Sequence, residues 1–340
     1  MIGTLRIYCE LLGAEELFSD PLVAFMAGFR EVLEGLGWRG SLEVVLKVLL
    51  PSEGDAVDEA LWDRLGGSGR QALAADRIWL WGQLVDRQRV YLNTGTHEAV
   101  FSGWRRLLAQ MAAAGVVPEG LFFDLEPDRW VLEVLSDSWV RGAGEVLGEA
   151  RLLSHRRSAL EIGEAVRGLM AQTGVPVLAA CAPLTLFGRW VPWAERVVGT
   201  PLVCEERGPI WPELTCMNYV SFGLPTLGGV GAARAWARSA RIGGWVARRH
   251  VAWARAQGVV PSVICGTNCV GILGDEPSYP DAASMRGLLL ATAAAKPNAL
   301  EVFNLTGIVY GPGGVDAEFR VDEGRWRAWA AVLGEALTAG

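Results

Sequence analysis

The sequence predicts an α/β fold of the (β/α)8 class, a TIM barrel, formed by a single domain. Short apolar runs rich in β-branched and aromatic residues alternate along the 340-residue chain with stretches of helical periodicity. The runs are continuously hydrophobic, which is typical of parallel strands that are buried on both faces. There are eight of them, and eight strands, mostly followed by helices, fit a barrel in a chain of this length.

In chain order, we expect strands at Leu5–Cys9, Leu42–Leu50, Arg77–Gln83, Gly120–Asp124, Pro176–Cys181, Leu214–Val220, Pro261–Cys265 and Ala299–Leu305. Glycine followed by proline precedes several of these runs, as is typical of loops that lead from a helix into a strand. Between the strands we expect helices, among them Asp20–Leu36, Glu98–Ala114, Ser158–Thr173, Ala232–Gln257, Ala282–Ala295 and Glu323–Leu337.

We expect one barrel over residues 1–340, because no linker divides the chain. A doubly wound sheet is disfavoured, since the first strand is followed by Glu10-Leu11-Leu12-Gly13 rather than by a glycine-rich phosphate loop. The connection at residues 182–213 is long, rich in Trp and Pro, and shows little helical pattern. We predict that it is a flap over the barrel mouth that carries Trp190, Trp193 or Trp211.

Composition and charge exclude several classes of protein. A chain with 51% hydrophobic and 20% charged residues is not disordered. A net charge of −7 without a Lys/Arg block predicts no nucleic-acid partner. No apolar run approaches the roughly 20 residues of a membrane span, and the first residues lack a signal-peptide pattern. We therefore expect no membrane partner and a cytoplasmic location. The Cys and His spacings fit neither a disulfide framework nor a zinc site, so we expect no metal and no cofactor.

Polar side chains follow most of the predicted strands, where barrel enzymes carry their catalytic groups. We predict the following as substrate-binding residues: Glu10, Trp81, Gln83, Trp211, Asn218, Asn268 and Asn304. The two tryptophans are included because an aromatic ring can stack on the apolar face of a sugar. The alternative for a tryptophan is core packing, which we favour for those in helical patterns, such as Trp104 and Trp329.

The segment Gly120-Leu121-Phe122-Phe123-Asp124-Leu125-Glu126-Pro127 predicts a pair of catalytic carboxylates. Asp124 and Glu126 are two residues apart, so in an extended segment both point toward the barrel mouth. Two close carboxylates repel each other, so the pKa of one rises and supplies a general acid beside an ionised partner. The alternative is a structural strand end whose acids cap the next helix.

This segment resembles the strand-four signature of family 18 glycoside hydrolases, the chitinase-like enzymes, which ends in Asp-x-Glu. Met217-Asn218-Tyr219 resembles the Met-x-Tyr motif on strand six of that family. The resemblance implies that Glu126 protonates the glycosidic oxygen and that Asp124 orients the substrate's acetamido group. It also implies that Tyr219 holds this group, which itself attacks the anomeric carbon.

The resemblance covers these two motifs and the barrel order. The family carries a further Asp where this chain has Phe122, an Asp after the Tyr where it has Val220, and a strand-eight Trp that is not evident here. The departures indicate a remote relative or a convergent look-alike.

Lys47 lies within a predicted strand, Val44-Val45-Leu46-Lys47-Val48-Leu49-Leu50. A lysine there must find a partner or lower its pKa, and a Schiff-base enzyme would use it as nucleophile. We favour the alternative, a lysine that extends to solvent at the barrel rim or forms an ion pair with an acid on a neighbouring strand, such as Glu10.

The sequence thus predicts a hydrolase, a glycosidase-like enzyme that acts on a small or modified carbohydrate or an oligosaccharide. Two alternatives stay open. One is a metal- or lysine-dependent lyase or isomerase on the same barrel, and the other is a catalytically inactive barrel that binds carbohydrate.

Overall fold

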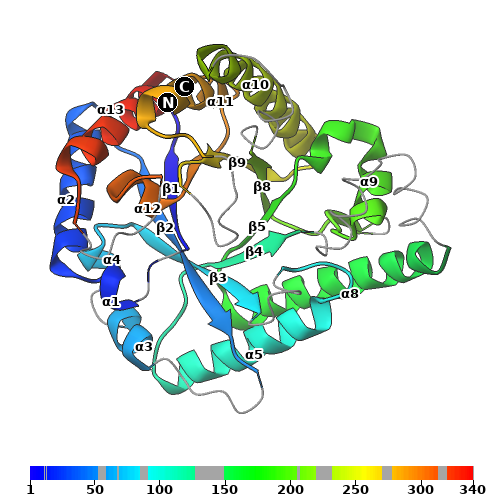
Figure 1. The fold of residues 1–340 in the computed structure, drawn as a ribbon. Coiled ribbons are helices and arrows are strands. Elements are labelled where there is room, and N and C mark those ends of the chain that lie inside the picture. Colours follow the sequence, from blue (N-terminus) through cyan, green and yellow to red (C-terminus); the bar gives the residue numbers. More distant parts are fainter. Residues whose placement is uncertain are drawn as a thin grey trace.

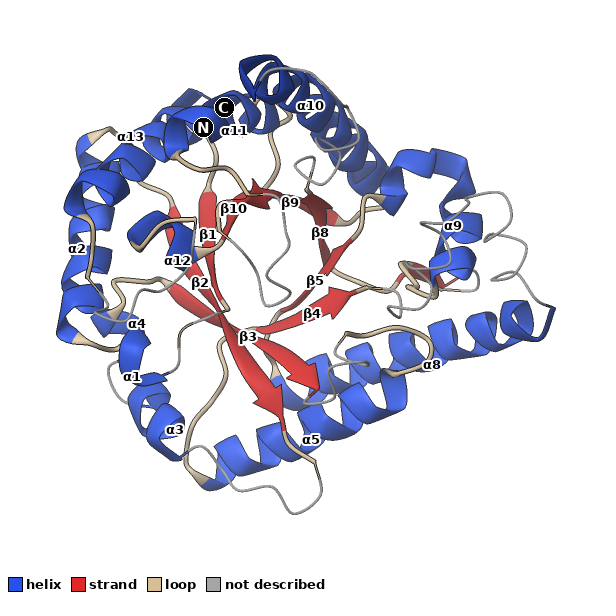
Figure 2. Ribbon diagram, in the orientation of Figure 1, coloured by secondary structure: helices blue, strands red, loops and turns tan. Residues whose placement is uncertain are grey.

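The structure, a computed structural model, describes residues 1–10, 12, 14–52, 59–66, 69–84, 91–126, 149–204, 207–219, 232–269, 278–312 and 320–339. Its centre is a closed barrel of parallel strands, surrounded by helices (Figures 1 and 2). Around the barrel the strands follow the order β1-β10-β9-β8-β5-β4-β3-β2. The predicted single (β/α)8 barrel is therefore confirmed.

The barrel strands are β1 (Thr4–Cys9), β2 (Ser41–Leu50), β3 (Arg77–Leu84), β4 (Leu121–Leu125), β5 (Val177–Cys181), β8 (Glu213–Asn218), β9 (Val260–Thr267) and β10 (Ala299–Phe303). Each of the eight predicted strands is present within two residues of its expected bounds. Nearly all residues of these strands are buried, because the barrel interior covers one face and the helices cover the other. The first and last strands pair, with Thr4 opposite Ala299, and this pairing closes the barrel.

The helices between the strands are α1 (Ala14–Leu17), α2 (Asp20–Gly35), α3 (Glu59–Gly66), α4 (Gly69–Ala72), α5 (His97–Ala113), α8 (Glu149–Thr173), α10 (Ala232–Ala256), α11 (Ala282–Ala293), α12 (Leu305–Val309) and α13 (Glu323–Ala339). The predicted helices are present, although α8 begins nine residues before the expected Ser158. In α2 the buried side chains recur at helical spacing along one face, and this stripe packs on the barrel. They are Leu22, Phe25, Met26, Phe29 and Leu33.

The lower half of the barrel interior, toward the N-terminal ends of the strands, holds a buried ionic network. Arg6 donates to Glu43 (Nε to Oε2, 2.6 Å), to Glu213 (Nη1 to Oε1, 2.5 Å) and to Glu301 (Nη1 to Oε1, 2.9 Å). The hydroxyls of Tyr8, Thr215 and Ser262 and the indole N–H of Trp79 donate to the same carboxylates. We call these eight residues the Arg6 cluster.

Above the Arg6 cluster, four aromatic rings fill the middle of the barrel. Tyr8 and Phe122 contact edge to face with their centroids 5.3 Å apart, and Trp81 lies 5.9 Å from Phe122 and 6.2 Å from Phe303. Because these rings are buried, they form a closed apolar floor for the upper end of the barrel. We call Tyr8, Trp81, Phe122 and Phe303 the aromatic floor.

The segment at 182–213 contains more regular structure than its sequence predicts. It forms the 3-10 helix η1 (Leu184–Trp190), the helix α9 (Val191–Val198) and a hairpin of β6 (Val203–Cys204) and β7 (Gly208–Pro209). These elements pack against α8 and α10 in the outer layer, to the right in Figure 1. The weak helical pattern of the segment therefore did not reveal these short helices, and a flap over the mouth stays a prediction. A short helix with proline near its start and Gly199 in the left-handed conformation at its end is too brief to show clear periodicity.

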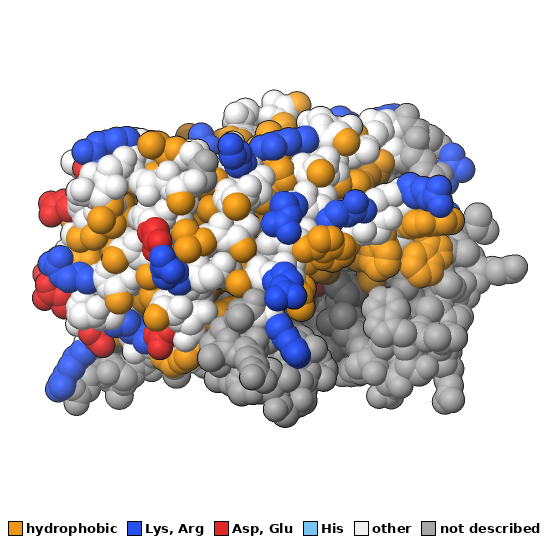
Figure 3. Space-filling view, turned by 90° about the horizontal axis from the view of Figure 1, so that it is seen from above, with side chains coloured by type: hydrophobic (Ala, Val, Ile, Leu, Met, Phe, Trp, Pro, Cys, Tyr) orange, Lys and Arg blue, Asp and Glu red, His pale blue; other side chains and the backbone are white. Residues whose placement is uncertain are grey.

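Charge is distributed unevenly over the surface. Figure 3 shows Lys and Arg side chains spread over the face at the top of Figure 1, whereas Asp and Glu gather toward one edge. The helix α10, which contains no acidic residue, contributes the exposed Arg238, Arg241, Arg248 and Arg249. Among the helices that the structure describes, none combines the length and the apolar character needed to cross a membrane.

Candidate active site

The strand registers bring several predicted site residues together at the C-terminal ends of the strands. Tyr8 is opposite Val45, so Glu10 and Lys47, two residues further along each strand, are neighbours on the inner face. Trp81 is opposite Phe122, so Gln83 and Asp124 are neighbours in the same way. Side chains of alternate residues point to the same face, and these residues therefore line the barrel mouth above the aromatic floor. With Glu126 and Tyr219 they form what we call the mouth group: Glu10, Lys47, Gln83, Asp124, Glu126 and Tyr219.

Asp124 has a strongly perturbed electrostatic environment. Its side chain is buried, and burial raises its pKa well above the usual value because the charged form loses hydration. The negative charges of Glu126 and of Glu10 raise the pKa further. The acid whose pKa is raised is thus Asp124, whereas the family resemblance assigns the general acid to Glu126. Glu126, one position beyond the strand, is only partly buried and so lies closer to solvent.

On β3 and β4, three buried polar atoms at the mouth have no hydrogen-bond partner among the described residues. They are the indole nitrogen of Trp81, Nε2 of Gln83 and Oδ1 of Asp124. Buried polar groups in folded proteins are nearly always hydrogen-bonded, because leaving one unsatisfied costs about 1–3 kcal/mol. Two donors and one acceptor on neighbouring strands thus offer hydrogen bonds to a bound polar molecule.

Tyr219 lies across the barrel from this group and packs on the aromatic floor. Its ring is 6.2 Å from that of Phe303, with an angle of 54° between the ring planes. It follows β8, where Thr215 and Met217 face inward, so the period of two places Tyr219 on the inner face as well. Both motifs on which the family resemblance rests therefore present a side chain to the same barrel mouth.

Lys47 is half-buried at the mouth. Desolvation lowers its pKa, and the opposite charge of Glu10 counteracts part of that shift. The interpretation of Lys47 as an ion-paired lysine next to Glu10 agrees with this arrangement, although a lowered pKa also favours the nucleophilic amine form.

Two predicted binding residues point away from the mouth. Asn218 faces the helical layer, where its Nδ2 donates to the carbonyl of Gly243 in α10 (3.0 Å). Trp211 is 1% exposed, stacks on the outward-facing Phe123 and donates through its indole N–H to the carbonyl of Pro201 (3.0 Å). Trp211 is thus part of the core between barrel and helices. Trp190 and Trp193 are 58% and 40% exposed on the outer layer.

Asn268 and Asn304 interact with each other at the ends of β9 and β10. Oδ1 of Asn268 accepts from the backbone N–H of Asn304 (2.6 Å), and Oδ1 of Asn304 accepts from the N–H of Gly307 at the start of α12. The side chains therefore shape the loop after β10, while the Nδ2 atom of each has no partner among the described residues. Those two amide groups could still donate to a ligand.

Sequence reasoning missed most of the aromatic floor. Only Trp81 was predicted to bind substrate. Tyr8 and Phe122 each lie two residues before an acidic residue at a strand end, and Phe303 is the last residue of β10. The signal was available, because every second residue of a barrel strand faces the axis. No group of three or more His, Cys, Asp or Glu side chains among the described residues has the arrangement of a metal site, and all six cysteines are buried and unbonded to one another.

Comparison with known proteins shows what this fold resembles. No protein-family model matches the sequence, and no curated protein matches it. Among solved structures, the chain superposes on the catalytic domain of a hyperthermophilic chitinase from Pyrococcus furiosus with a TM-score of 0.51 and 12% identity, covering 100% of this chain and 96% of that one.

Two further structures extend the comparison. Active domain 2 of the thermostable Pyrococcus furiosus chitinase, studied as catalytic-site mutants complexed with chito-oligosaccharides, gives a TM-score of 0.50 at 10% identity, over 100% and 96% of the two chains. A Bacteroidetes-affiliated GH5 cellulase gives 0.54 at 12% identity, over 99% and 91%. At these identities the likeness concerns the fold, and the remote resemblance to chitinase-like barrels that the sequence predicts is confirmed at that level.

Proposed function

We propose that the protein is a glycoside hydrolase-like enzyme that acts on a small or modified carbohydrate, with Glu126 as the proton donor. The observation that carries the proposal is the Asp124–Glu126 pair at the end of β4, with Asp124 buried and its pKa raised by burial, by Glu126 and by Glu10. Such a pair holds a proton at a pH where separate carboxylates would be ionised.

The pair can supply that proton to a glycosidic bond. Asp124 passes the proton that the pair shares to Glu126, which is nearer to solvent. Glu126 gives this proton to the glycosidic oxygen as the bond from that oxygen to the anomeric carbon breaks. The resemblance to family 18 implies that the carbonyl oxygen of the substrate's own acetamido group then bonds to the anomeric carbon. Asp124 and Tyr219 would hold that group, and water would complete the hydrolysis by adding to the same carbon while Glu126 recovers a proton.

The chemistry of the mouth suits a neutral sugar. The unsatisfied donors of Trp81 and Gln83 match hydroxyl or carbonyl oxygens, and the aromatic floor matches the apolar face of a pyranose ring. The chito-oligosaccharides bound to the Pyrococcus furiosus chitinase domain support chito-oligosaccharides as the first substrates to assay.

Replacing Glu126 with Gln tests the proposal. The amide keeps the shape of the side chain but has no transferable proton, so turnover should fall by roughly 10²–10⁴-fold while binding of oligosaccharide changes little. Initial rates on chito-oligosaccharides and on aryl glycosides with good leaving groups provide the measurement. The exposed Glu31 of α2 supplies a matched control, because Glu31→Gln makes the same chemical change far from the mouth.

Two outcomes would contradict the proposal. A Glu126→Gln protein with near-wild-type turnover removes this residue from the mechanism and with it the main ground for a glycosidase. A wild-type protein that binds glycans on an array but turns over none of them would be the inactive, carbohydrate-binding barrel.

Lys47 favours a second candidate, a lyase or isomerase that forms an imine. Its amine is half-buried at the mouth and its pKa is lowered, so more of it is in the nucleophilic form. The chain contains only two lysines, and the other, Lys296, is exposed in the turn before β10 at the opposite end of the barrel. Borohydride reduction with a keto sugar should then add a mass adduct that Lys47→Met loses and Lys296→Met keeps. An unlabelled wild-type protein would eliminate this candidate.

A further inference from the structure

The exposed face of α10 carries only arginine and apolar side chains. The helix contains no acidic residue, and from Arg238 to Ala256 every exposed residue is Arg, Trp, Ile or Ala. The exposed positions recur with the period of an α-helix, so they lie along one face. The arginines are Arg238, Arg241, Arg248, Arg249 and Arg255, and the large apolar side chains are Ile242 (44% exposed) and Trp245 (49% exposed).

Most arginines of this face lack a carboxylate partner. Arg238, Arg241, Arg248 and Arg249 form no ion pair with any residue that the structure describes. On the neighbouring helix α11, by contrast, the exposed Arg286 pairs with a glutamate of α13. A row of cations without described partners, on a chain whose net charge is −7, leaves one positive surface on an acidic protein.

Exposed aromatic rings continue this surface onto η1 and α9. The 3-10 helix η1 packs on α10, and Nη2 of Arg249 lies 3.6 Å from the position that a Cβ atom on Gly188 would occupy. Phe187 and Trp190 lie on either side of that contact in η1, and the ring of Phe187 is 6.3 Å from that of Trp193 in α9. All three aromatic side chains are at least 40% exposed. We call the exposed face of α10 together with Phe187, Trp190 and Trp193 the Arg-Trp surface.

The Arg-Trp surface combines apolar and positively charged side chains without acidic ones. In Figure 3, hydrophobic side chains form a row on the right, beside Lys and Arg side chains, whereas Asp and Glu gather toward the left. Exposed apolar patches of several large side chains mark surfaces that meet a protein or a membrane. The positive charge around this patch requires that the partner be anionic.

We propose that the Arg-Trp surface binds the surface of an anionic lipid bilayer. Arginine forms charge-assisted hydrogen bonds with phosphate and carboxylate groups such as those of lipid headgroups. Tryptophan favours the membrane interface, because its apolar body enters the acyl boundary while its indole N–H stays among the headgroups. The two residue types alternate along α10, so both reach the bilayer in one orientation of the protein.

The composition of the surface favours lipid over a protein or a nucleic acid. Those partners are recognised through a defined pattern of hydrogen bonds, to which amide and hydroxyl side chains contribute. From Arg238 to Ala256, α10 exposes no such side chain. A fluid layer of anionic headgroups needs only charge and apolar area. The expectation of no membrane partner rests on the lack of a spanning segment, which binding at the surface does not require.

Co-sedimentation with lipid vesicles tests the proposal. Vesicles of phosphatidylcholine and phosphatidylserine in roughly equal parts provide an anionic surface, and vesicles of phosphatidylcholine alone provide a neutral one. We expect the protein to bind the anionic vesicles at least about tenfold more tightly than the neutral ones. Added salt should weaken this binding, because it screens the charges. The mouth group takes no part, so the outcome is independent of the function proposed above.

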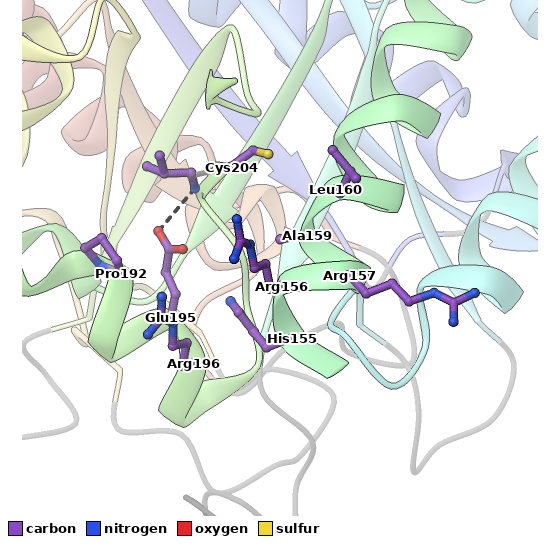
Figure 4. A pocket seen from close by; sticks show the side chains of 10 residues that line it. His155, Arg156, Arg157, Ala159, Leu160, Pro192, Glu195, Arg196 and Cys204 are labelled. Atoms are coloured by element: carbon purple, nitrogen blue, oxygen red, sulfur yellow. Dashed lines mark hydrogen bonds between the residues drawn. The ribbon is translucent and has the colours of Figure 1, made fainter. Parts of the chain in front are cut away.

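Removing arginines from two parts of the surface separates specific binding from net charge. Arg241→Gln combined with Arg248→Gln should weaken binding about 25-fold, since each arginine near an anionic bilayer contributes about fivefold. Arg157→Gln combined with Arg207→Gln removes the same charge and is the matched control. Arg157 extends away from the pocket between α8 and α9 (Figure 4), and both control arginines already pair with glutamates of α8. The control should therefore bind nearly as the wild type does.

The aromatic part has its own test. Trp190→Ser combined with Trp193→Ser should weaken binding about tenfold, because less apolar area leaves water, whereas the exposed Val117→Ser in the loop before β4 should have no effect. Thermal unfolding verifies that every variant is folded.

Three outcomes would overturn the proposal. One is equal binding to the anionic and the neutral vesicles, or to neither. Another is the same affinity in the α10 variant and in its control. The third is binding of single-stranded DNA or of polyglutamate that anionic vesicles do not displace, which would assign the Arg-Trp surface to a nucleic acid or to an acidic protein.

Discussion

The two ends of the barrel interior are both polar, but they differ in how completely their groups are satisfied. In the Arg6 cluster one guanidinium meets three carboxylates, and no buried polar atom lacks a hydrogen-bond partner. At the mouth, Trp81, Gln83 and Asp124 leave buried polar atoms unpaired. Both ends lie on the same strands, so the strands alone do not explain the difference.

The comparison teaches how to separate polar residues that hold a fold from those prepared for a ligand. In a satisfied network, hydrogen bonds and ion pairs within the protein compensate for the loss of hydration. In an unsatisfied one, that loss stays uncompensated until a ligand binds. Three comparisons between variants can break or sharpen this distinction.

Arg6→Met should produce the largest effect. It removes the cation that neutralises Glu43, Glu213 and Glu301 and leaves buried, like-charged carboxylates close together. We expect a loss of about 3–5 kcal/mol in the free energy of unfolding, measured by guanidinium chloride denaturation. Arg30→Met, which breaks a partly exposed pair with Glu34 and Asp76, should cost no more than about 1 kcal/mol. Similar losses in the free energy of unfolding of the two variants would show that the buried Arg6 cluster stabilises the fold no more than a surface ion pair does.

Trp79 and Trp81 should respond oppositely to the same substitution. They face the interior two residues apart on β3, but the indole N–H of Trp79 donates to Glu43 (2.7 Å) and that of Trp81 has no described partner. Trp79→Phe should lower the free energy of unfolding by about 1–3 kcal/mol and leave KM unchanged. Trp81→Phe should leave stability nearly unchanged and raise KM up to about tenfold, the worth of one hydrogen bond. Denaturation gives the free energy of unfolding of both variants, and steady-state kinetics gives their KM values. The same changes in both variants would refute the contrast.

Asp124→Asn should change the pH dependence of stability, the smallest of the three effects. Because the pKa of Asp124 is raised above 3.8 in the folded protein, the folded state holds a proton that the unfolded state has lost. The free energy of unfolding of the wild type therefore falls as pH rises from about 4 through the raised pKa. The Asn variant lacks this decline, so its stability relative to the wild type should increase across that window. Asp63→Asn, on the exposed side of α3, controls for the lost charge, and parallel pH curves for wild type and Asp124→Asn would contradict the assignment.

The fold was predictable because its signal is local. Each barrel strand is a short apolar run such as Val177–Cys181, and α2 and α5 each carry a stripe of buried side chains. The segment at 182–213 was not predictable, since α9 has only eight residues. Its burial depends on distant helices, because α8 packs on α9 and β6 and α10 packs on η1.

The site was predictable in part. The strand registers bring Glu10, Gln83 and Asp124 to the mouth, as the strand ends predict, because register follows once the strands are known; their roles in binding and catalysis stay predictions. Asn218 was misplaced because the adjacent Tyr219 takes the inward position and the period of two sends Asn218 outward. Composition could not show that Trp211 packs in the core on Phe123, which precedes it by 88 positions in the numbering.

The Arg6 cluster also links distant parts of the chain, since the carboxylates that Arg6 binds lie 37, 207 and 295 residues away. An N-terminal half barrel would retain one cation and Glu43, whereas a C-terminal half would retain Glu213 and Glu301 with no guanidinium between them. The N-terminal half would carry the guanidinium that the carboxylates of the C-terminal half need for neutralisation. Two separately expressed halves would therefore attract each other through these complementary charges. The ionic core that holds the barrel together thus also determines where it can be divided and reassembled.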